Sequence, residues 1–270
     1  MPSFYDTHAH LDDPDFTPDL AQLLERARTA EITKIVAIGT DHDSSARAIK
    51  LAEAHPGVYA AVGWHPNEAT AAPADLRPTL RELAKHPKVV AIGETGLDYY
   101  RLPSTKGGTP ADDVPFKRLQ AEMFKQQLEV AAEAGLNCVI HQRGDCLDDT
   151  LAILEPFASQ VRGVFHCFAG DTTALHRVLA LGCIVSFTGI VTFKNGQNVR
   201  DTLAATPLAK FMLETDCPYL APIPFRGQRC EPAHVKEISE TVAQVKGCSL
   251  EELSRATCAT AAGFFHRLDG

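Results

Sequence analysis

FYDTHAHL, residues 4–11, is the stretch of this sequence that decides the fold. It begins as a β-rich run, Phe4–His8, that predicts the first strand. A doubly wound, dinucleotide-binding sheet would carry a glycine-rich turn directly after its first strand. This chain has His8-Ala9-His10-Leu11 there instead. The stretch therefore favours a closed barrel, with the doubly wound sheet as the alternative.

Seven more β-rich runs follow, with helix-compatible stretches between them. Helical periodicity is clearest over Leu20–Ala30, Phe116–Ala134 and Leu250–Phe265. Alternating helices and nearly continuous apolar strands predict parallel βαβ units. With 270 residues, we predict an α/β fold, a single (β/α)₈ TIM barrel forming one domain over residues 1–270. The predicted strands are Phe4–His8, Thr33–Gly39, Val58–Gly63, Lys88–Gly93, Asn137–His141, Val161–His166, Cys183–Phe187 and Lys210–Glu214.

Composition excludes several other classes of protein. Apolar residues make up 45% of the chain and charged residues 22%, which is ordinary for a globular protein. No apolar run approaches the roughly 18 residues that span a bilayer, so we expect no membrane insertion. The eight cysteines form no CxxC pair and no secretory segment precedes the first strand. We therefore predict a cytoplasmic location, and no obligatory protein partner is evident.

The net charge bears on nucleic-acid binding. Lys and Arg number 26 against 34 Asp and Glu, a net charge of −8, which opposes non-specific binding to nucleic acid through a basic surface. Two bound divalent cations would add about four positive charges where a phosphate would sit. A phosphodiester substrate is therefore compatible with the acidic chain.

One long irregular segment is predicted, Arg101–Pro115, with the sequence RLPSTKGGTPADDVP. Its three prolines and two adjacent glycines predict a surface loop directly after the fourth strand. On a barrel this loop would lie on the active-site face as a lid or a substrate-guiding wall, and a mobile insertion without a role is the alternative.

Six side chains that can bind metal stand at the ends of predicted strands. Imidazole with carboxylate suits Zn²⁺, Mn²⁺, Fe²⁺ or Co²⁺, and Mg²⁺ less well. Such residues gathered at strand tips predict hydrolysis assisted by two divalent ions, Mg, Mn, Zn or Co. The predicted ligands are His8, His10, Glu94, His141, His166 and Asp216.

Strand geometry assigns roles to these residues. His8 and His10 share one strand face, because residues i and i+2 point the same way. Barrel closure would bring Asp216 beside them, as a ligand of the first ion and the acceptor of the proton from the attacking water. Glu94 is expected where the chain leaves the barrel through a turn at Gly93, as a catalytic carboxylate bridging two ions about 3.5–4 Å apart. His141 and His166 would complete the second site.

Further residues are predicted to contact the substrate. Arginine suits phosphate, with a solvated surface position as the alternative. Glu214 is assigned either to a hydrogen bond behind the ligands or to the substrate. Trp64 could stack a base, although packing under a loop is more usual. The predicted substrate-binding residues are His65, Arg143, Glu214, Arg226 and Arg229.

The motifs DTHAHL, GWHP, IGETGLDYY, VIHQR, FHCFAG, VSFTG and LETDCPYLAP, in this order, resemble the TatD family of metal-dependent deoxyribonucleases in the amidohydrolase superfamily. The likeness spans nearly the whole chain. It implies a TIM barrel that binds divalent metals through the six ligands and cleaves DNA as an exonuclease, with single-stranded ends as the substrate. The chain departs from the family at Cys230, where the family has Asn, at Gln142, where it more often has Ser, and in the longer segment 101–115. These departures leave the substrate preference open.

Two alternatives remain at this stage. The same barrel and ions could direct water at a carbonyl carbon, as in an ester or amide hydrolase such as a D-aminoacyl-tRNA deacylase. A catalytically silent scaffold is the other, and the intact ligand set argues against it.

Overall fold

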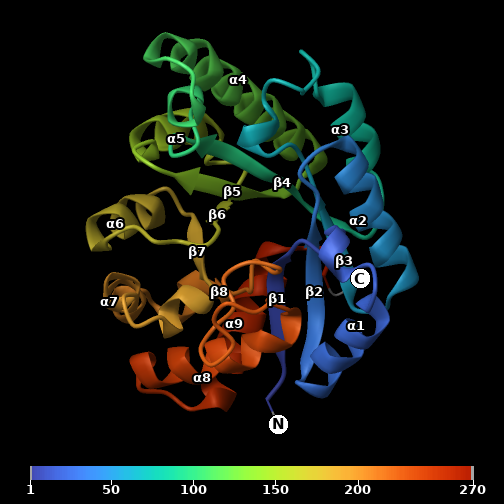
Figure 1. The fold of residues 1–270 in the computed structure, drawn as a ribbon, viewed down its shortest axis with the longest axis vertical. Helices are drawn as coiled ribbons and strands as arrows, with labels where there is room; N and C mark the ends of the chain where they lie inside the picture. Colours follow the sequence, from blue (N-terminus) through green and yellow to red (C-terminus); the bar gives the residue numbers. More distant parts are fainter. Residues whose placement is uncertain (1, 269–270) are drawn as a thin grey trace.

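A computed structural model describes residues 2–268, and within them eight parallel strands form one sheet in the order β1 to β8. Helices surround the strands (Figure 1), so the predicted (β/α)₈ barrel is confirmed. The strands are β1 Phe4–Ala9, β2 Ile32–Ile38, β3 Val58–Val62, β4 Val89–Asp98, β5 Asn137–Arg143, β6 Gly163–Phe165, β7 Ile184–Phe187 and β8 Phe211–Leu213. The helices are α1 Leu20–Thr29, α2 His42–Ala54, α3 Arg77–Ala84, α4 Pro110–Ala134, α5 Leu147–Leu154, α6 Thr172–Ala180, α7 Gln197–Ala205, α8 Val235–Lys246 and α9 Leu250–Phe264. Short 3₁₀ turns lie at Pro14–Phe16, Pro66–Glu68, Pro103–Lys106, Glu155–Phe157, Gly189–Thr192, Leu208–Lys210 and Pro232–His234.

The barrel closes where the chain beyond β8 runs beside the end of β1. Ala9 and Cys217 form a parallel bridge. The backbone N–H of Asp216 donates to the carbonyl oxygen of His8 at 2.9 Å. Segments that are about two hundred positions apart in the sequence therefore meet at the strand tips, as the sequence predicts.

Apolar side chains fill the barrel in two layers. One layer packs the outward faces of the strands against the helices. The other lies inside the barrel and contains residues of β2 to β8. The two residues from β2 are two positions apart, as are the two from β3, so each pair shares one strand face. This inner layer contains Val36, Ile38, Tyr59, Ala61, Val90, Ala91, Val139, Val164, Ile184 and Met212.

The C-terminal segment closes the end of the barrel where the strands begin. Phe264, Phe265 and Leu268 pack onto the inner layer. Arg267 donates to the carbonyl oxygen of Val89, the first residue of β4, at 3.0 Å. With this end filled, only the carboxyl ends of the strands are left for a site, as in other barrels of this class.

The predicted surface loop over Arg101–Pro115 is correct for residues 101–109, which contain only a 3₁₀ turn, and wrong for residues 110–115, which belong to α4. Helix α4 begins at Pro110, six residues before the predicted start, whereas α1 and α9 agree with prediction to one residue. The Asp112 carboxylate accepts from the backbone N–H of Thr109 at 2.8 Å and from its hydroxyl at 2.7 Å. Proline is favoured at a first helical position, and this capping arrangement fixes the start. Pro115 lies in the second turn, where it removes one helical hydrogen bond.

Strand β4 is longer than predicted, and this moves Glu94 into the sheet. The chain does not leave the barrel at Gly93, because β4 continues to Asp98. Its register against β5 shifts between Ile92 and Thr95, which marks a bulge at Glu94. Gly93 has a φ of 119°, and a Cβ there would overlap the carbonyl oxygen of Val139. Glycine is therefore required to place Glu94.

Two expectations concern other features of the described residues. All eight cysteines are free thiols. Within residues 2–268, no helix combines the length and the apolar character needed to cross a membrane.

A buried carboxylate, Asp6, fastens β1 to the segment that follows β8. It accepts from the Thr215 hydroxyl at 2.6 Å, from the Thr215 N–H at 2.9 Å and from the His8 N–H at 3.3 Å. Burial raises the pKa of Asp6 from 3.8 to about 7, although these donors oppose the shift. Asp6 thus holds the barrel seam together next to His8.

Removal of Asp6 should loosen the seam. Asp6→Ala leaves buried donors of Thr215 without a partner, so the free energy of unfolding should fall by about 2–4 kcal/mol. Asp6→Asn should lose less, because an amide keeps one acceptor. Urea unfolding of both variants in chelator measures this, and equal stability of Asp6→Ala and wild type would contradict it.

The same variants carry a pH signature. A group with a raised pKa binds its proton more tightly in the folded state, so its stabilising contribution is full below pH 3.8 and is lost as pH rises through about 7. Asp6→Asn stays neutral, so its stability relative to wild type should increase between about pH 4 and about pH 8.

Candidate metal centre

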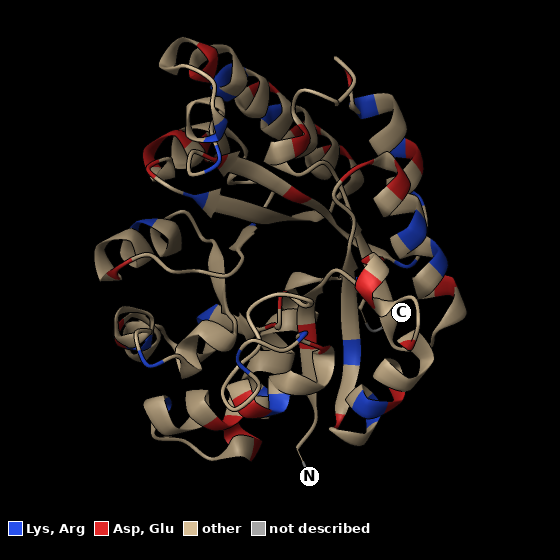
Figure 2. Ribbon diagram, viewed as in Figure 1, with Lys and Arg blue, Asp and Glu red and all other residues tan. Residues whose placement is uncertain are grey.

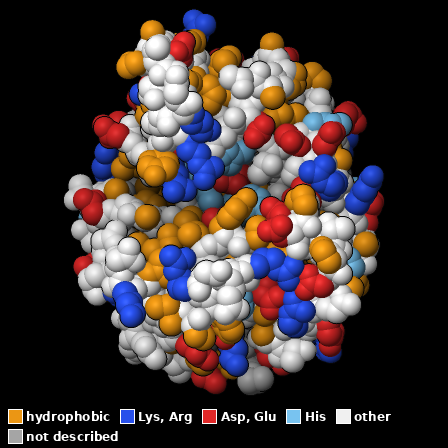
Figure 3. Space-filling view, in the orientation of Figure 1, with side chains coloured by type: hydrophobic (Ala, Val, Ile, Leu, Met, Phe, Trp, Pro, Cys, Tyr) orange, Lys and Arg blue, Asp and Glu red, His pale blue; other side chains and the backbone are white. Residues whose placement is uncertain are grey.

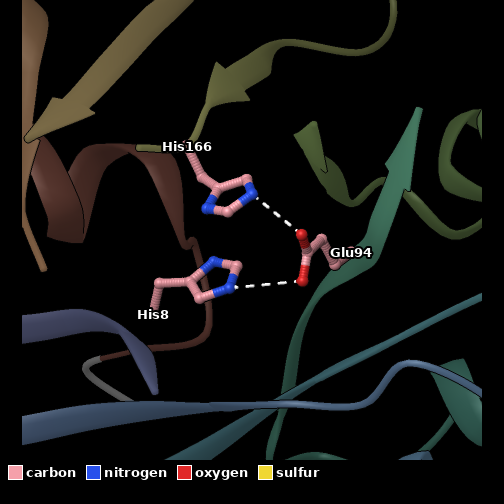
Figure 4. A group of neighbouring side chains, drawn as sticks. All are labelled: His8, Glu94 and His166. Atoms are coloured by element: carbon pink, nitrogen blue, oxygen red, sulfur yellow. Dashed lines mark ion pairs between the residues drawn. The ribbon is translucent and has the colours of Figure 1, made fainter. Parts of the chain in front are cut away.

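Glu94 lies at the centre of the site, and its two carboxylate oxygens face different histidines. Its Oε2 is 3.3 Å from Nε2 of His8 and 3.7 Å from Nε2 of His10. Its Oε1 is 2.8 Å from Nδ1 of His141 and 2.8 Å from Nε2 of His166. Figure 4 shows the two carboxylate oxygens facing the neighbouring rings of His8 and His166, one oxygen to each ring. One buried carboxylate therefore joins two groups of candidate ligands.

Asp216 completes the group on the β1 side. Its Oδ1 lies 3.6 Å from Nε2 of His8 and 3.4 Å from Nε2 of His10. The ligand atoms of these three residues lie within 4.8 Å of one another. Asp216 has a left-handed backbone, with φ of 59°. Such strained positions cluster at functional sites.

Buried atoms without hydrogen-bond partners show that these residues fit a cation. Among the described residues, Nε2 of His8 and Oε2 of Glu94 are buried, face each other and form no hydrogen bond. Buried polar atoms are normally paired. A divalent ion between an imidazole nitrogen and a carboxylate oxygen would satisfy both, and this donor set suits Zn²⁺, Mn²⁺ or Co²⁺.

The carboxylates are ionised, as metal binding requires. Burial alone would raise the pKa of Glu94, but the charge of His166 and a hydrogen bond with His141 hold it well below its ordinary value. Burial also opposes ionisation of Asp216, and a hydrogen bond with His10 outweighs it, so the pKa of Asp216 is lowered. Both side chains are therefore anionic at neutral pH.

The pKa values of the histidines are also shifted in the metal-free protein, but not all in the same direction. Burial disfavours a charged ring, yet the Glu94 carboxylate raises the pKa of His166 well above its ordinary value. Burial lowers the pKa of His8, with the charge of His166 acting in the same direction. A metal ion must displace the proton from a ring such as His166, whose pKa is raised. Metal binding at this site therefore releases protons.

His65 lies in the cluster but has its proton on the wrong nitrogen for a ligand. Its Nε2 is 3.4 Å from Oε1 of Glu94 and 3.3 Å from Nδ1 of His141. Its Nδ1 accepts the backbone N–H of Asn67 at 3.0 Å and so carries no proton. Burial lowers the pKa of His65 to about 4, which keeps the ring neutral. Its single proton is therefore on Nε2, and His65 presents a hydrogen-bond donor to the site.

Asp98 is a site residue that the sequence analysis missed. Its Oδ2 lies 3.3 Å from Nε2 of His141, the ring nitrogen that points away from Glu94. Metal-binding histidines commonly donate their second N–H to a carboxylate, which fixes the ring and raises its basicity. The other oxygen, Oδ1, accepts the N–H groups of Tyr100 and Arg101, both at 2.9 Å. Asp98 follows Glu94 by four residues, and in a strand this spacing puts both side chains on one face. This spacing was the sequence pattern that could have indicated Asp98 as a site residue.

Arg229 and Glu214 are both engaged by other residues of the chain, and for Glu214 this corresponds to the first of its two predicted roles. Arg229 was expected to clamp phosphate, but both of its Nη atoms bind the Asp19 carboxylate, at 2.7 and 2.8 Å, so its planar fork is occupied. Glu214 is buried, accepts the Cys167 N–H at 2.6 Å and lies 3.7 Å from Nδ1 of His166. Glu214 thus supports a ligand from behind.

The remaining predicted contacts lie as follows. The Arg143 guanidinium is 4.8 Å from the centre of the Tyr100 ring. The Arg226 guanidinium is 3.9 Å from the centre of the Phe193 ring. Trp64 is buried, with 4% of its surface exposed, so its ring is packed rather than free to stack a base. Cys167 and Cys217, which adjoin His166 and Asp216 in the sequence, belong to no candidate ligand group among the described residues.

Loss of Asp98 should weaken metal binding without removing a ligand. Asp98→Asn should lower metal affinity by about 10–100-fold, because His141 loses the carboxylate that orients it. Isothermal titration with Mn²⁺ measures the affinity. Asp149→Asn is the matched control, since Asp149 binds the Tyr99 hydroxyl and touches no ligand. Equal affinities in the two variants would show that Asp98 does not support the site.

Metal content should separate ligands from the donor His65. Glu94→Gln and Asp216→Asn should bind less metal after gel filtration and should lose most of the metal-induced rise in Tm. His65→Gln should keep both, because Nε2 of His65 carries a proton. Mass spectrometry of bound metal checks this. If His65→Gln also loses metal, the proton assignment is wrong.

Comparison with known proteins identifies the family. Residues 5–266 match the family model described as TatD related DNase. The chain is 37% identical to the "uncharacterized metal-dependent hydrolase YabD" of Bacillus subtilis, over 97% of this chain and 98% of that protein. It is 35% identical to the "3'-5' ssDNA/RNA exonuclease TatD" of Pantoea vagans, over 93% and 94% of the two chains. The crystal structure of YjjV, a TatD homologue from Escherichia coli, superposes with a TM-score of 0.87 at 28% identity, covering 97% of this chain and 98% of that one. The chain therefore belongs to the TatD family of metal-dependent hydrolases.

Proposed function

We propose that this protein hydrolyses phosphodiester bonds at the end of single-stranded nucleic acid, using two divalent ions. The division of the Glu94 carboxylate between two groups of histidines carries the proposal. Metal sites that share a bridging carboxylate are suited to in-line displacement at phosphorus. A relative named as a 3'-5' ssDNA/RNA exonuclease supports the choice of substrate.

The two sites would be held by different residues. The first would use His8, His10 and Asp216, and the second His141 and His166, with Glu94 shared. When bound, such ions polarise phosphoryl oxygens and lower the pKa of a water between them. This assignment matches the roles predicted from the sequence.

The chain's own groups would handle the proton and the phosphate charge. Asp216 is ionised and close to His8 and His10, so it would accept the proton of the attacking water. His65 would donate its Nε2–H to an oxygen of the bound phosphate. Asp216 and Glu94 are thus proposed as catalytic residues, and His65 as a substrate contact.

The proposal makes a direct prediction about substrate and metal. The purified protein should release nucleotides from a linear single-stranded oligothymidylate only with added divalent metal, and chelator should abolish the reaction. Asp216→Asn should lose at least about a hundred-fold in kcat, because both a ligand charge and the proton acceptor are gone. Product analysis by chromatography gives the rates.

Two control substrates sharpen this assay. Circular single-stranded DNA should resist cleavage if an end is required. A D-aminoacyl-tRNA ester tests the alternative of carbonyl chemistry. Hydrolysis of the ester with no cleavage of either nucleic acid would replace the phosphodiesterase proposal.

A further inference from the structure

A group of unpaired cations lies beside the metal centre, although the chain is acidic overall. An open groove of about 710 Å³ is lined by Tyr99, Tyr100, Arg101, Thr105, Lys106 and Gly144. Among residues 2–268, no carboxylate pairs with the side chain of Arg101, Lys106 or Arg143. We call Tyr100, Arg101, Lys106 and Arg143 the basic wall. Basic positions occur at the tip of β5 and between β4 and α4 (Figure 2), and Lys and Arg side chains gather beside the hollow in which histidines are visible (Figure 3).

The basic wall includes an exposed aromatic face. Tyr100 is 62% exposed, and the guanidinium of Arg143 lies 4.8 Å from its ring centre. An exposed tyrosine with arginine and lysine around it combines a stacking surface with phosphate binding, the combination that holds single strands without sequence preference. A duplex has no unpaired base to offer this ring.

Asp98 couples the basic wall to the metal centre. One of its oxygens faces His141 and the other holds the N–H groups of Tyr100 and Arg101. Tyr100 follows Asp98 by two residues, so the chain can separate them by at most about 7 Å. The wall therefore begins within reach of the nucleotides adjoining a phosphate bound at the ions.

A second exposed ring lies beside His10. Tyr219 is 56% exposed, and its ring centre is 6.0 Å from that of His10. The metal centre therefore has a second exposed aromatic ring at its edge, next to a candidate ligand.

We propose that the basic wall binds the substrate strand beyond the cleaved phosphate, with one base stacked on Tyr100 and the adjoining phosphates held by the cations. This inference rests on the proposed function and adds the path of the strand. It gives long single strands an advantage over small phosphodiesters that occupy the metals alone.

The test compares two substrates of the metal-loaded protein. One is a linear oligothymidylate, and the other is methyl p-nitrophenyl phosphate, a small diester that carries no nucleotide for the wall to bind. For Tyr100→Ala, the ratio of kcat/KM on the oligonucleotide to that on the ester should fall about 5- to 100-fold, the range for loss of one base stack. Tyr100→Phe keeps the ring and should restore the ratio to within about threefold of wild type.

Salt dependence tests the cations independently. Arg143→Gln should reduce the slope of log kcat/KM against log salt by about 0.7 on the oligonucleotide, the value for one phosphate contact of a single strand. The matched control is Arg255→Gln, since Arg255 is an exposed residue of α9, and it should leave the slope unchanged. Circular dichroism melts confirm that the variants are folded.

The outcomes separate the two proposals. Wild-type protein that cleaves neither substrate with metal overturns the proposed function, and the strand path with it. Wild-type cleavage with unchanged ratio and slope in the variants overturns the strand path alone. Equal losses on both substrates would place the effect of Tyr100 at the metal centre and also reject the wall.

Discussion

Closure of the barrel between β8 and β1 is the constraint on which the site depends. The Asp216 N–H donates to the His8 carbonyl oxygen. Asp6, two residues before His8 in β1, accepts two hydrogen bonds from Thr215, the residue before Asp216. These contacts bring an acidic residue near the end of the chain to histidines near its beginning. Because the backbone of both partners is fixed by the seam, the side chains of Asp216 and His8 converge without further support from loops. The contacts that close the barrel at this seam therefore also set the geometry of the site.

Much of the fold was predictable because each barrel strand is short, apolar and followed by a helix. The failure over residues 110–115 has a specific cause. Proline and glycine content was taken as evidence for a loop, whereas Pro110 occupies a first helical position and Asp112 caps the Thr109 backbone. Composition alone cannot separate a helix start from a loop, because the same residues serve both. The position of Pro110 relative to Thr109 and Asp112 holds the distinguishing information.

The ligand set could be proposed from sequence because strand ends converge in a barrel, while its surroundings could not. Asp98 was overlooked because β4 was ended at Gly93, and only the extended strand aligns Asp98 with Glu94. Arg229 was assigned to phosphate from its residue type, but its partner Asp19 lies some two hundred positions away. Pairing of this kind depends on tertiary contacts that no local pattern encodes. Side chains fixed by the strand period were thus predictable, and those fixed by distant partners were not.

The position of Asp98 has a thermodynamic consequence. One carboxylate holds His141 through one oxygen and the backbone at Tyr100 and Arg101 through the other. If a nucleic-acid strand binds there and orders that backbone, Asp98 would carry the effect to the ring that would hold an ion. Linked binding equilibria are reciprocal. If a bound nucleic-acid strand raises the affinity for the ion by some factor, the bound ion raises the affinity for that nucleic-acid strand by the same factor. The metal ion and the nucleic acid would therefore each strengthen binding of the other. Occupancy of the metal site would then depend on the concentration of nucleic-acid ends as well as on that of the metal.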